Sequence, residues 1–283
     1  MAARGSLECH ASPGGGSCMI ITVFTGNHPR HTALIASLAS VAESVYAVVE
    51  CSTLFPGKVA DTFRRSEVME QYFNRVIAAE HQVFGRSRFL PDNVRSLPLK
   101  AGDLNELGMD VLNDSLQADI FVIFGASYIK GPLVEHLVSR RACNIHMGIS
   151  PYYRGSSCNF WALYDRRPDL VGATIHLLSK GLDSGPMLCH ALPAAEPVDP
   201  FVLGMKAVRA AHAALVDLIS SGEIADLEPV IQDKTSQIRY TRNADFTDAV
   251  AEEYLLNAPE PDEIHRALMV RDPSLFLRCR VGY

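Results

Sequence analysis

The chain of 283 residues is 48% apolar and 20% charged, which is an ordinary composition for a folded protein and excludes a disordered one. A formal net charge of -6 weighs against a nucleic-acid partner, because nucleic-acid binding depends on clustered Lys and Arg. We therefore expect one principal domain with its own core that acts on a small molecule.

The seven Cys residues form no C-x-x-C pair, and an odd, scattered set suits neither a disulfide framework nor a zinc site. We expect reduced thiols, a cytoplasmic location and no metal. Residues 1–18 carry an acidic residue and a run of Gly, Ser and Pro where a signal peptide needs an apolar stretch, so we expect a flexible N-terminal tail. No window has the apolar length of a membrane span, and no membrane partner is expected.

Strand and helix patterns alternate along the first part of the chain. Met19–Phe24 is a short β-rich apolar run followed by a helical pattern, and Val45–Glu50 predicts a second buried strand. A long helical stretch follows over about residues 58–83, and residues 85–103 indicate a loop with one short strand.

Asp119–Phe124 is almost wholly apolar, as expected of a strand that is covered on both faces of a parallel sheet. The elements predicted after it are a helix near Pro132–Ser139, strands at Cys143–His146, Ala173–Leu178 and Met187–Leu192, and a helix over Phe201–Ser221.

This alternation predicts an α/β fold, a Rossmann-like open and mostly parallel sheet with helices on both faces, whose ligand crevice lies beyond the carboxyl ends of the strands. We assign residues 19–221 to one catalytic domain. The pattern weakens beyond it, and residues 222–283 are expected to form a small C-terminal appendage, a candidate contact surface if the protein is a homodimer. Residues 201–283 hold nine Lys and Arg against thirteen Asp and Glu, so 9 − 13 gives −4 and no basic arm.

The triplet Asn144-Ile145-His146 places two polar side chains on the same side of a short strand. An Asn amide and a His N–H are the kind of donors that stabilise the oxyanion formed in acyl transfer to an amine. Such a triplet is also an ordinary strand end, and short motifs have a high false-positive rate.

Asp183 follows in a glycine-flanked turn and is our candidate for the base that takes the proton of the attacking amine. A carboxylate beside His146 is expected to raise the pKa of the imidazole and favour its protonated form. The alternative for Asp183 is a turn-forming role.

Four segments in order resemble the folate-dependent formyltransferase family, which includes glycinamide ribonucleotide, methionyl-tRNA and sugar N-formyltransferases. They are residues 144–155 (NIHMGISPYYRG), 159–163 (NFWAL), 172–176 (GATIH) and 181–185 (GLDSG). The resemblance implies that Asn144, His146 and Asp183 are the catalytic residues. The sequences of the first two segments, residues 144–155 and 159–163, are most similar to the sugar N-formyltransferase branch.

The same resemblance implies that a loop binds the pterin of 10-formyltetrahydrofolate largely through backbone groups, and that Arg154 reaches substrate or cofactor. A plain β–α turn and a surface salt bridge are the respective alternatives. The loop residues are Phe124, Gly125, Ala126, Ser127, Tyr128 and Ile129. We expect Phe160 and Trp161 to be core residues, and His176 and His190 to be core histidines satisfied by hydrogen bonds.

The turn after the first strand offers a further candidate site. Asn27, His28 and Arg30 stand at a helix N-terminus, where a phosphate or carboxylate of the substrate could bind. Pro29 after Asn27 and His28 is equally typical of simple helix capping.

We interpret the chain as an N-formyltransferase whose partners are a reduced folate and a small amine. Amino sugars, nucleotide-linked amino sugars, amino acids and antibiotic precursors all remain open as acceptors. Three alternatives also remain: a methionyl-tRNA formyltransferase, a hydrolase that releases formate from the folate, and a folate-binding module without catalysis.

Overall fold

The structure is a computed structural model that describes residues 19–59 and 65–282. The expected N-terminal tail, residues 1–18, lies outside the described residues. The first elements are β1 (Ile20–Gly26), α1 (Pro29–Ala39), β2 (Ser44–Cys51), α2 (Glu67–Phe84), β3 (Val94–Lys100), β4 (Ile120–Phe124) and α3 (Gly131–Ser139). The next are β5 (Cys143–His146), β6 (Tyr153–Gly155), α4 (Cys158–Tyr164), β7 (Ala173–Leu177), β8 (Met187–Pro193) and α5 (Pro200–Ser220). The last are α6 (Glu223–Asp226), β9 (Arg239–Thr241), α7 (Asp248–Asn257), α8 (Pro261–Met269) and β10 (Arg280–Gly282).

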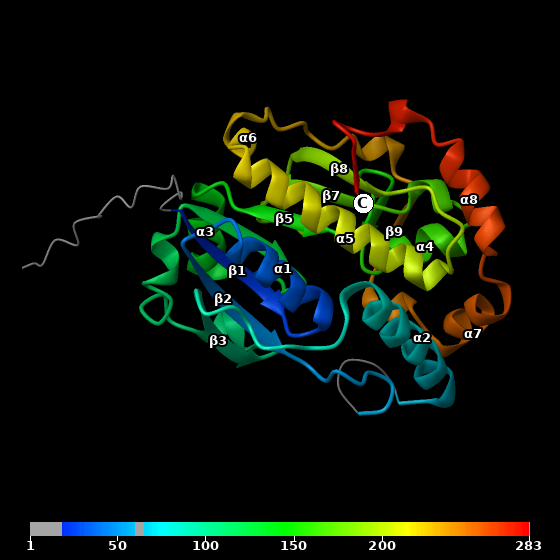
Figure 1. Ribbon diagram of the computed structural model, residues 1–283, viewed down its shortest axis with the longest axis horizontal. Helices are drawn as coiled ribbons and strands as arrows, with labels where there is room; N and C mark the ends of the chain where they lie inside the picture. The colour runs from blue at the N-terminus through cyan, green and yellow to red at the C-terminus, as the bar shows by residue number, and fades with distance from the viewer. Residues whose placement is uncertain (1–18, 60–64, 283) are drawn as a thin grey trace, which may run out of the picture.

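The predicted α/β architecture is confirmed. Eight strands form one sheet in the order β10-β8-β7-β5-β4-β1-β2-β3, and within it β7 alone is antiparallel to its neighbours. The helices α1 and α5 run side by side over one face, as Figure 1 shows, and α3 covers the other face, as the view from above makes clear. The open, mostly parallel sheet with helices on both faces is therefore the scaffold of this protein.

The helix expected over residues 58–83 begins later than its pattern indicated. Ser66 is the N-cap of α2, and its hydroxyl oxygen accepts a hydrogen bond from the Met69 amide at 3.1 Å. A serine in this position satisfies an amide that has no partner within the helix, which fixes the start of α2 at Glu67.

The C-terminal segment is built into the same fold. Its last strand, β10, pairs in parallel with β8 at the edge of the large sheet, and β9 pairs in parallel with β6. Ala251, Tyr254 and Ile264 from α7 and α8 are buried in a core cluster with α4 and the start of α5. The weakening sequence pattern after residue 221 therefore reflects short elements, one of which, β9, forms a small second sheet with β6.

None of the helices in the described ranges combines the length and the apolar character that crossing a bilayer requires. The five cysteines among the described residues, Cys51, Cys143, Cys158, Cys189 and Cys279, are free thiols.

The layer of α5 against the sheet should contribute strongly to stability. Leu215 is fully buried in this layer, so Leu215→Ala is expected to lower the free energy of unfolding by about 2–5 kcal/mol. Urea unfolding measures this change. The matched control is Leu256→Ala on α7, where the side chain is 79% exposed and the same truncation should change little. Equal effects of the two substitutions would contradict the packing described.

Candidate active site

Two polar side chains project from β5 toward the same side, as their spacing predicted. Asn144 and His146 alternate with Cys143 and Ile145, which are buried in the core cluster that contains α1 and α5. The period of a strand therefore turns Asn144 and His146 away from those two helices. His146 is almost fully buried, and Asn144 is partly exposed.

Asp183 reaches these two side chains from the loop between β7 and β8. Because β7 is antiparallel to β5, this loop leaves the sheet where β5 begins, not at the carboxyl ends of the parallel strands where we expected it. Asp183 itself has a left-handed backbone (φ 44°), a conformation that Asp tolerates better than most residues. Gly185 is required nearby, because a Cβ atom there would lie 1.7 Å from the Leu177 carbonyl oxygen.

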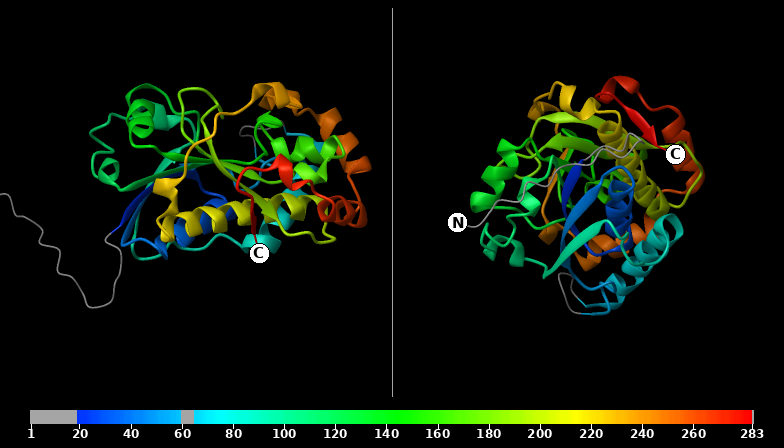
Figure 2. Two further views of the ribbon diagram at one scale, coloured as in Figure 1. Left: turned by 90° about the horizontal axis from the view of Figure 1, so that it is seen from above. Right: turned by 60° about the vertical axis from the view of Figure 1, so that its left-hand side comes forward.

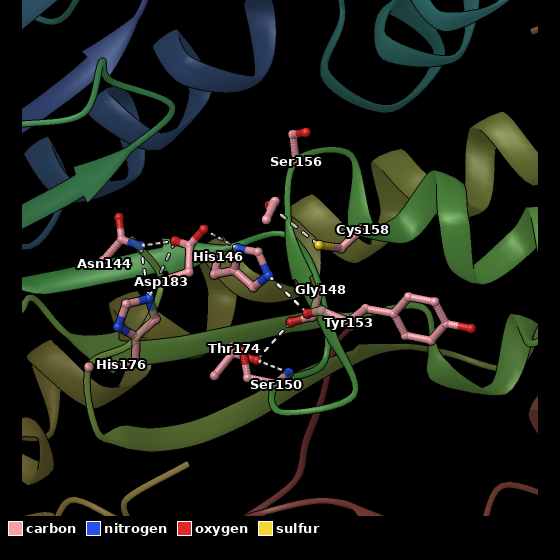
Figure 3. A network of polar contacts seen from close by, with 12 residues as sticks. Asn144, His146, Gly148, Ser150, Tyr153, Ser156, Cys158, Thr174, His176 and Asp183 are labelled. Carbon is pink, nitrogen blue, oxygen red and sulfur yellow. Dashed lines mark hydrogen bonds and ion pairs between the residues drawn. The ribbon is translucent and has the colours of Figure 1, made fainter. Parts of the chain in front are cut away.

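The three predicted catalytic residues are in contact (Figure 3). The Asn144 Nδ2 donates to Asp183 Oδ1 at 3.4 Å, and His146 Nδ1 lies 3.4 Å from Asp183 Oδ2. The other ring nitrogen of His146, Nε2, faces the backbone carbonyl oxygen of Tyr153 at 3.3 Å. The imidazole is thus held between a carboxylate and a carbonyl oxygen, both of which are acceptors.

His176 is a buried histidine with hydrogen-bond partners on both ring nitrogens, as predicted, and it is also a fourth member of this network. It lies directly opposite Asn144 in the β5–β7 register, and its Nε2 lies 2.9 Å from Asn144 Nδ2. Its Nδ1 lies 2.8 Å from the Leu177 carbonyl oxygen and must donate to it, which leaves Nε2 as the acceptor for Asn144. His176 therefore fixes the orientation of the Asn144 amide.

Gln232, from the C-terminal segment, holds the loop that carries Asp183. Its buried Nε2 donates to the carbonyl oxygens of Asp183 at 2.9 Å and Gly185 at 2.8 Å. No sequence signal marks this residue, because the contact joins positions 49 residues apart.

The protonation of the site differs from our expectation. Burial lowers the pKa of His146, and although Asp183 raises it, the net pKa lies below the ordinary histidine value. The expected increase is wrong because removal from water penalises the imidazolium more than one carboxylate favours it.

Asp183 responds in the opposite sense to burial. Burial alone would raise its pKa, but its electrostatic interactions with His146, His176 and Arg154 hold the pKa below the usual carboxyl value. At neutral pH the pair is therefore an ionised carboxylate beside a neutral imidazole.

Two cavities adjoin this network. One, of about 260 Å³, is lined by His146 and by the aromatic side chains of Tyr72, Phe160, Phe201 and Tyr254. The other, of about 100 Å³, is lined by Asn144, His176, Asp183 and residues of the loop after β4. Phe160 is mostly buried, as is Trp161, which confirms their place in the core.

The loop expected to bind a pterin divides into two parts. Ala126, Ser127, Tyr128 and Ile129 line the smaller cavity. The Phe124 ring instead packs edge-on against His31 and His212 inside the protein. Gly125 has a positive φ of 68° and sits so close to His31 that a Cβ atom would lie 2.6 Å from its Nε2.

The expected anion site at the turn after β1 contains the protein's own carboxylate. Glu80 Oε1 accepts from the Arg30 amide at 3.0 Å and from Arg30 Nη1 at 2.8 Å, and His28 Nδ1 lies 3.8 Å from Glu80 Oε2. Asn27 is tied to the backbone of Ser52 through two hydrogen bonds. Glu80 and Ser52 thus already engage these residues, and substrate-anion binding at this turn stays a prediction.

Arg154 lies inside the protein. It is 9% exposed, its Nη1 donates to Gln237 Oε1 at 3.4 Å, and its buried Nε has no hydrogen-bond partner among the described residues. The alternative of a surface salt bridge is therefore excluded. Its charge is close enough to lower the pKa values of both Asp183 and His146.

Among residues 19–59 and 65–282, no group of three or more His, Cys, Asp or Glu side chains is arranged to hold a metal ion.

Comparison with known proteins agrees with the motif resemblance. The family model described as formyl transferase matches residues 75–219, just over half of the chain. A methionyl-tRNA formyltransferase of Synechococcus sp. (strain JA-3-3Ab) is 30% identical over 125 residues, which cover 42% of this chain and 37% of that protein. Another from Thermosynechococcus vestitus is 38% identical over 74 residues, or 26% of this chain and 22% of that protein. The chain thus spans about a third or less of the length of these relatives.

A solved structure shares the fold over nearly the whole chain. It is a Mycobacterium tuberculosis protein regarded as a sugar N-formyltransferase, with a TM-score of 0.52, 15% identity, and coverage of 94% of this chain and 97% of that one. The extent of the family match, taken with this fold, shows that the chain belongs to the folate-dependent formyl transferase family.

The electrostatics of the pair can be measured by NMR titration of the histidine rings. We expect His146 to titrate below the ordinary value of about 6.5. Asp183→Asn should lower the midpoint further, because it removes the charge that favours the imidazolium. Asp92→Asn, on an exposed loop, is the control and should leave the midpoint unchanged. A midpoint above about 6.5 would show that the carboxylate outweighs burial, and a rise in Asp183→Asn would show that the carboxylate does not favour the imidazolium.

The role of Gln232 can be tested by Gln232→Met, which keeps a similar side-chain length but leaves two carbonyl oxygens without their donor. We expect a loss of about 1–3 kcal/mol in the free energy of unfolding and faster amide exchange at residues 183–185. Gln82→Met on the exposed side of α2 is the matched control. Unchanged exchange at residues 183–185 would mean that Gln232 does not hold the loop.

Proposed function

We propose that this protein transfers a formyl group from 10-formyltetrahydrofolate to the amine of a small molecule, with Asn144, His146 and Asp183 as the catalytic residues. The observation that carries the proposal is the position of this trio between two cavities of different character. Two substrates that enter from opposite sides would meet at the trio, as a direct transfer requires. Membership of the formyl transferase family supports the same reaction.

The smaller cavity suits the reacting end of a reduced folate. Its walls are mainly the apolar side chains of Ile123, Ile129, Leu178 and Leu182 and the backbone of the loop after β4. At about 100 Å³ it would enclose only one end of the molecule, and the half-exposed side chains of Tyr128 and Leu182 flank it. A flat heterocycle between apolar walls, with backbone groups at its edge, fits this lining.

The larger cavity suits an acceptor with an uncharged body. Among its described lining residues His146 is the one with an ordinary pKa near neutrality, and its lowered pKa keeps it uncharged there. Four aromatic side chains offer broad apolar surfaces, which favour the apolar face of a sugar ring over a highly charged group. An amino sugar is therefore the acceptor class that we propose.

The chemistry follows from the protonation of the trio. The amine nitrogen attacks the formyl carbon and forms the new C–N bond, while the carbonyl oxygen becomes an oxyanion. The Asn144 hydrogen whose contact with Asp183 is long, 3.4 Å, turns toward the oxyanion. The neutral His146 takes the proton released by the amine, and Asp183 stabilises the imidazolium that results.

Collapse of the intermediate completes the transfer. The bond between the formyl carbon and folate N10 breaks, and N10 receives the proton that His146 holds. His146 returns to its neutral form, which its buried position favours. No covalent intermediate with the protein and no metal is needed for this sequence.

A methionyl-tRNA formyltransferase is the second candidate, because the relatives of Synechococcus and Thermosynechococcus carry that name. The charge of residues 201–283, which is −4 from nine basic and thirteen acidic residues, speaks against a tRNA surface there. A salt-sensitive gel shift with initiator tRNA would favour this second candidate.

The proposal is tested by incubating the protein with 10-formyltetrahydrofolate and a panel of amino sugars and other amines. Tetrahydrofolate release that depends on the amine, together with a product heavier by one formyl group, is the expected result. Formate release without an amine would indicate a hydrolase. Folate binding without any release across the panel would indicate a module without catalysis, and either result would overturn the proposal.

The role of the carboxylate gives a sharper test within the same assay. Asp183→Asn should fold normally but lose at least about 100-fold in turnover, because it can no longer stabilise the protonated His146. Asp92→Asn makes the same chemical change on an exposed loop and should retain the wild-type rate. A wild-type rate in Asp183→Asn would refute the assignment.

A further inference from the structure

A third cavity, of about 460 Å³, lies between α1, the end of α2 and α5. The two helices α1 and α5 run side by side on the face of the sheet nearer the viewer in Figure 1. Asn144 and His146 point away from these helices, so the sheet separates this cavity from the proposed catalytic trio. The cavity is therefore not part of the two substrate cavities described above.

Positive charge gathers around this cavity. Arg86 and Arg88, from the loop after α2, and Arg209, from α5, line it, and none of the described lining residues is acidic. No carboxylate in the described part of the chain lies within ion-pair distance of these three guanidinium groups. Several other arginines do form ion pairs with a carboxylate of a neighbouring element. Although the chain has six more acidic than basic residues, these three arginines lie together without a counter-charge among residues 19–59 and 65–282.

Two buried polar atoms in the cavity wall also have no partner among the described residues. They are Nε of Arg209 and Nε2 of His212, and the His212 side chain is only 4% exposed. Residues 209 and 212 are one turn apart on α5, so the two groups face the same region. Buried polar groups are normally hydrogen-bonded, so two unpaired atoms beside an open cavity indicate a ligand.

Apart from the hydroxyl side chains of Thr32, Ser37 and Ser40, the remaining wall of the cavity is apolar. Ala36 of α1, Ala213 and Val216 of α5, and the rings of Phe84 and Phe89 line it, and Phe89 is fully exposed. The Phe84 and Phe124 rings pack against His212, and burial lowers the pKa of His212 to about 3, with a further decrease from the charge of Arg30. His212 is therefore neutral, and the arginines alone supply the charge.

We propose that this cavity binds an organic phosphate, with the phosphate between Arg86, Arg88 and Arg209 and an apolar body against α1 and α5. Three guanidinium groups suit the two charges of a phosphate monoester better than the single charge of a carboxylate. His212 Nε2 forms a hydrogen bond to a polar atom of the body. The site is separate from transfer of the formyl group and does not depend on that proposal.

The test uses phenyl phosphate, which combines a phosphate with an apolar ring, in isothermal titration calorimetry with the full chain. We expect saturable binding at least 10-fold tighter than that of inorganic phosphate, weaker binding of benzoate and no binding of benzylamine. Equal affinity for phenyl phosphate and inorganic phosphate would overturn the apolar half of the proposal, and binding of benzylamine would overturn the electrostatic half.

Substitutions of the three arginines test whether phenyl phosphate binds in this cavity. Arg209→Gln and, separately, the double variant of Arg86→Gln and Arg88→Gln should each weaken phenyl phosphate binding at least 10-fold. The double variant lies on an exposed loop and keeps the test valid if Arg209→Gln fails to fold. Arg95→Gln, on β3, is the matched control, and Asp183→Asn should bind as the wild type does. Unchanged binding in the loop variant, or lost binding in Asp183→Asn, would place phenyl phosphate elsewhere and refute the proposal.

Discussion

The antiparallel pairing of β7 with β5 is the constraint on which the candidate active site depends. It sets His176 opposite Asn144 and sends the following loop back across the sheet, so that Asp183 meets both side chains of β5. If β7 were parallel to β5, the connection after it would begin at the opposite end of the strands, beside the carboxyl end of β5. One reversed strand therefore brings together four polar residues from three segments of the chain.

Burial then decides the chemistry of these residues. The ring of His146 lies between two acceptors, Asp183 and the Tyr153 carbonyl oxygen, and only the protonated ring satisfies both. Removal from water opposes that protonated form. The contacts of His146 thus favour a protonated ring, while its burial makes the protonated ring unfavourable in the resting protein. This combination suits a group that holds a proton only briefly during a reaction.

The sequence was sufficient for those features that depend on local periodicity. The alternating strands and helices, the common side of Asn144 and His146, and the burial of Phe160 and Trp161 all follow from patterns within a few residues. Contacts between distant segments could not be predicted from the sequence. Glu80 satisfies Arg30 from 50 positions away, and Gln232 reaches the Asp183 loop across 49, so neither partner could be found from spacing. The pKa of His146 depends on burial that no motif records.

The hold of Gln232 on the loop of Asp183 has a consequence for biosynthesis. All three residues of the proposed catalytic trio are present once residue 183 has been translated, but the loop of Asp183 is anchored only after a segment 49 residues later has emerged and folded back. The edge strand β10 is added later still. A nascent chain or a truncated product could therefore contain every residue of the proposed trio and a largely formed sheet while the loop of Asp183 is still unanchored.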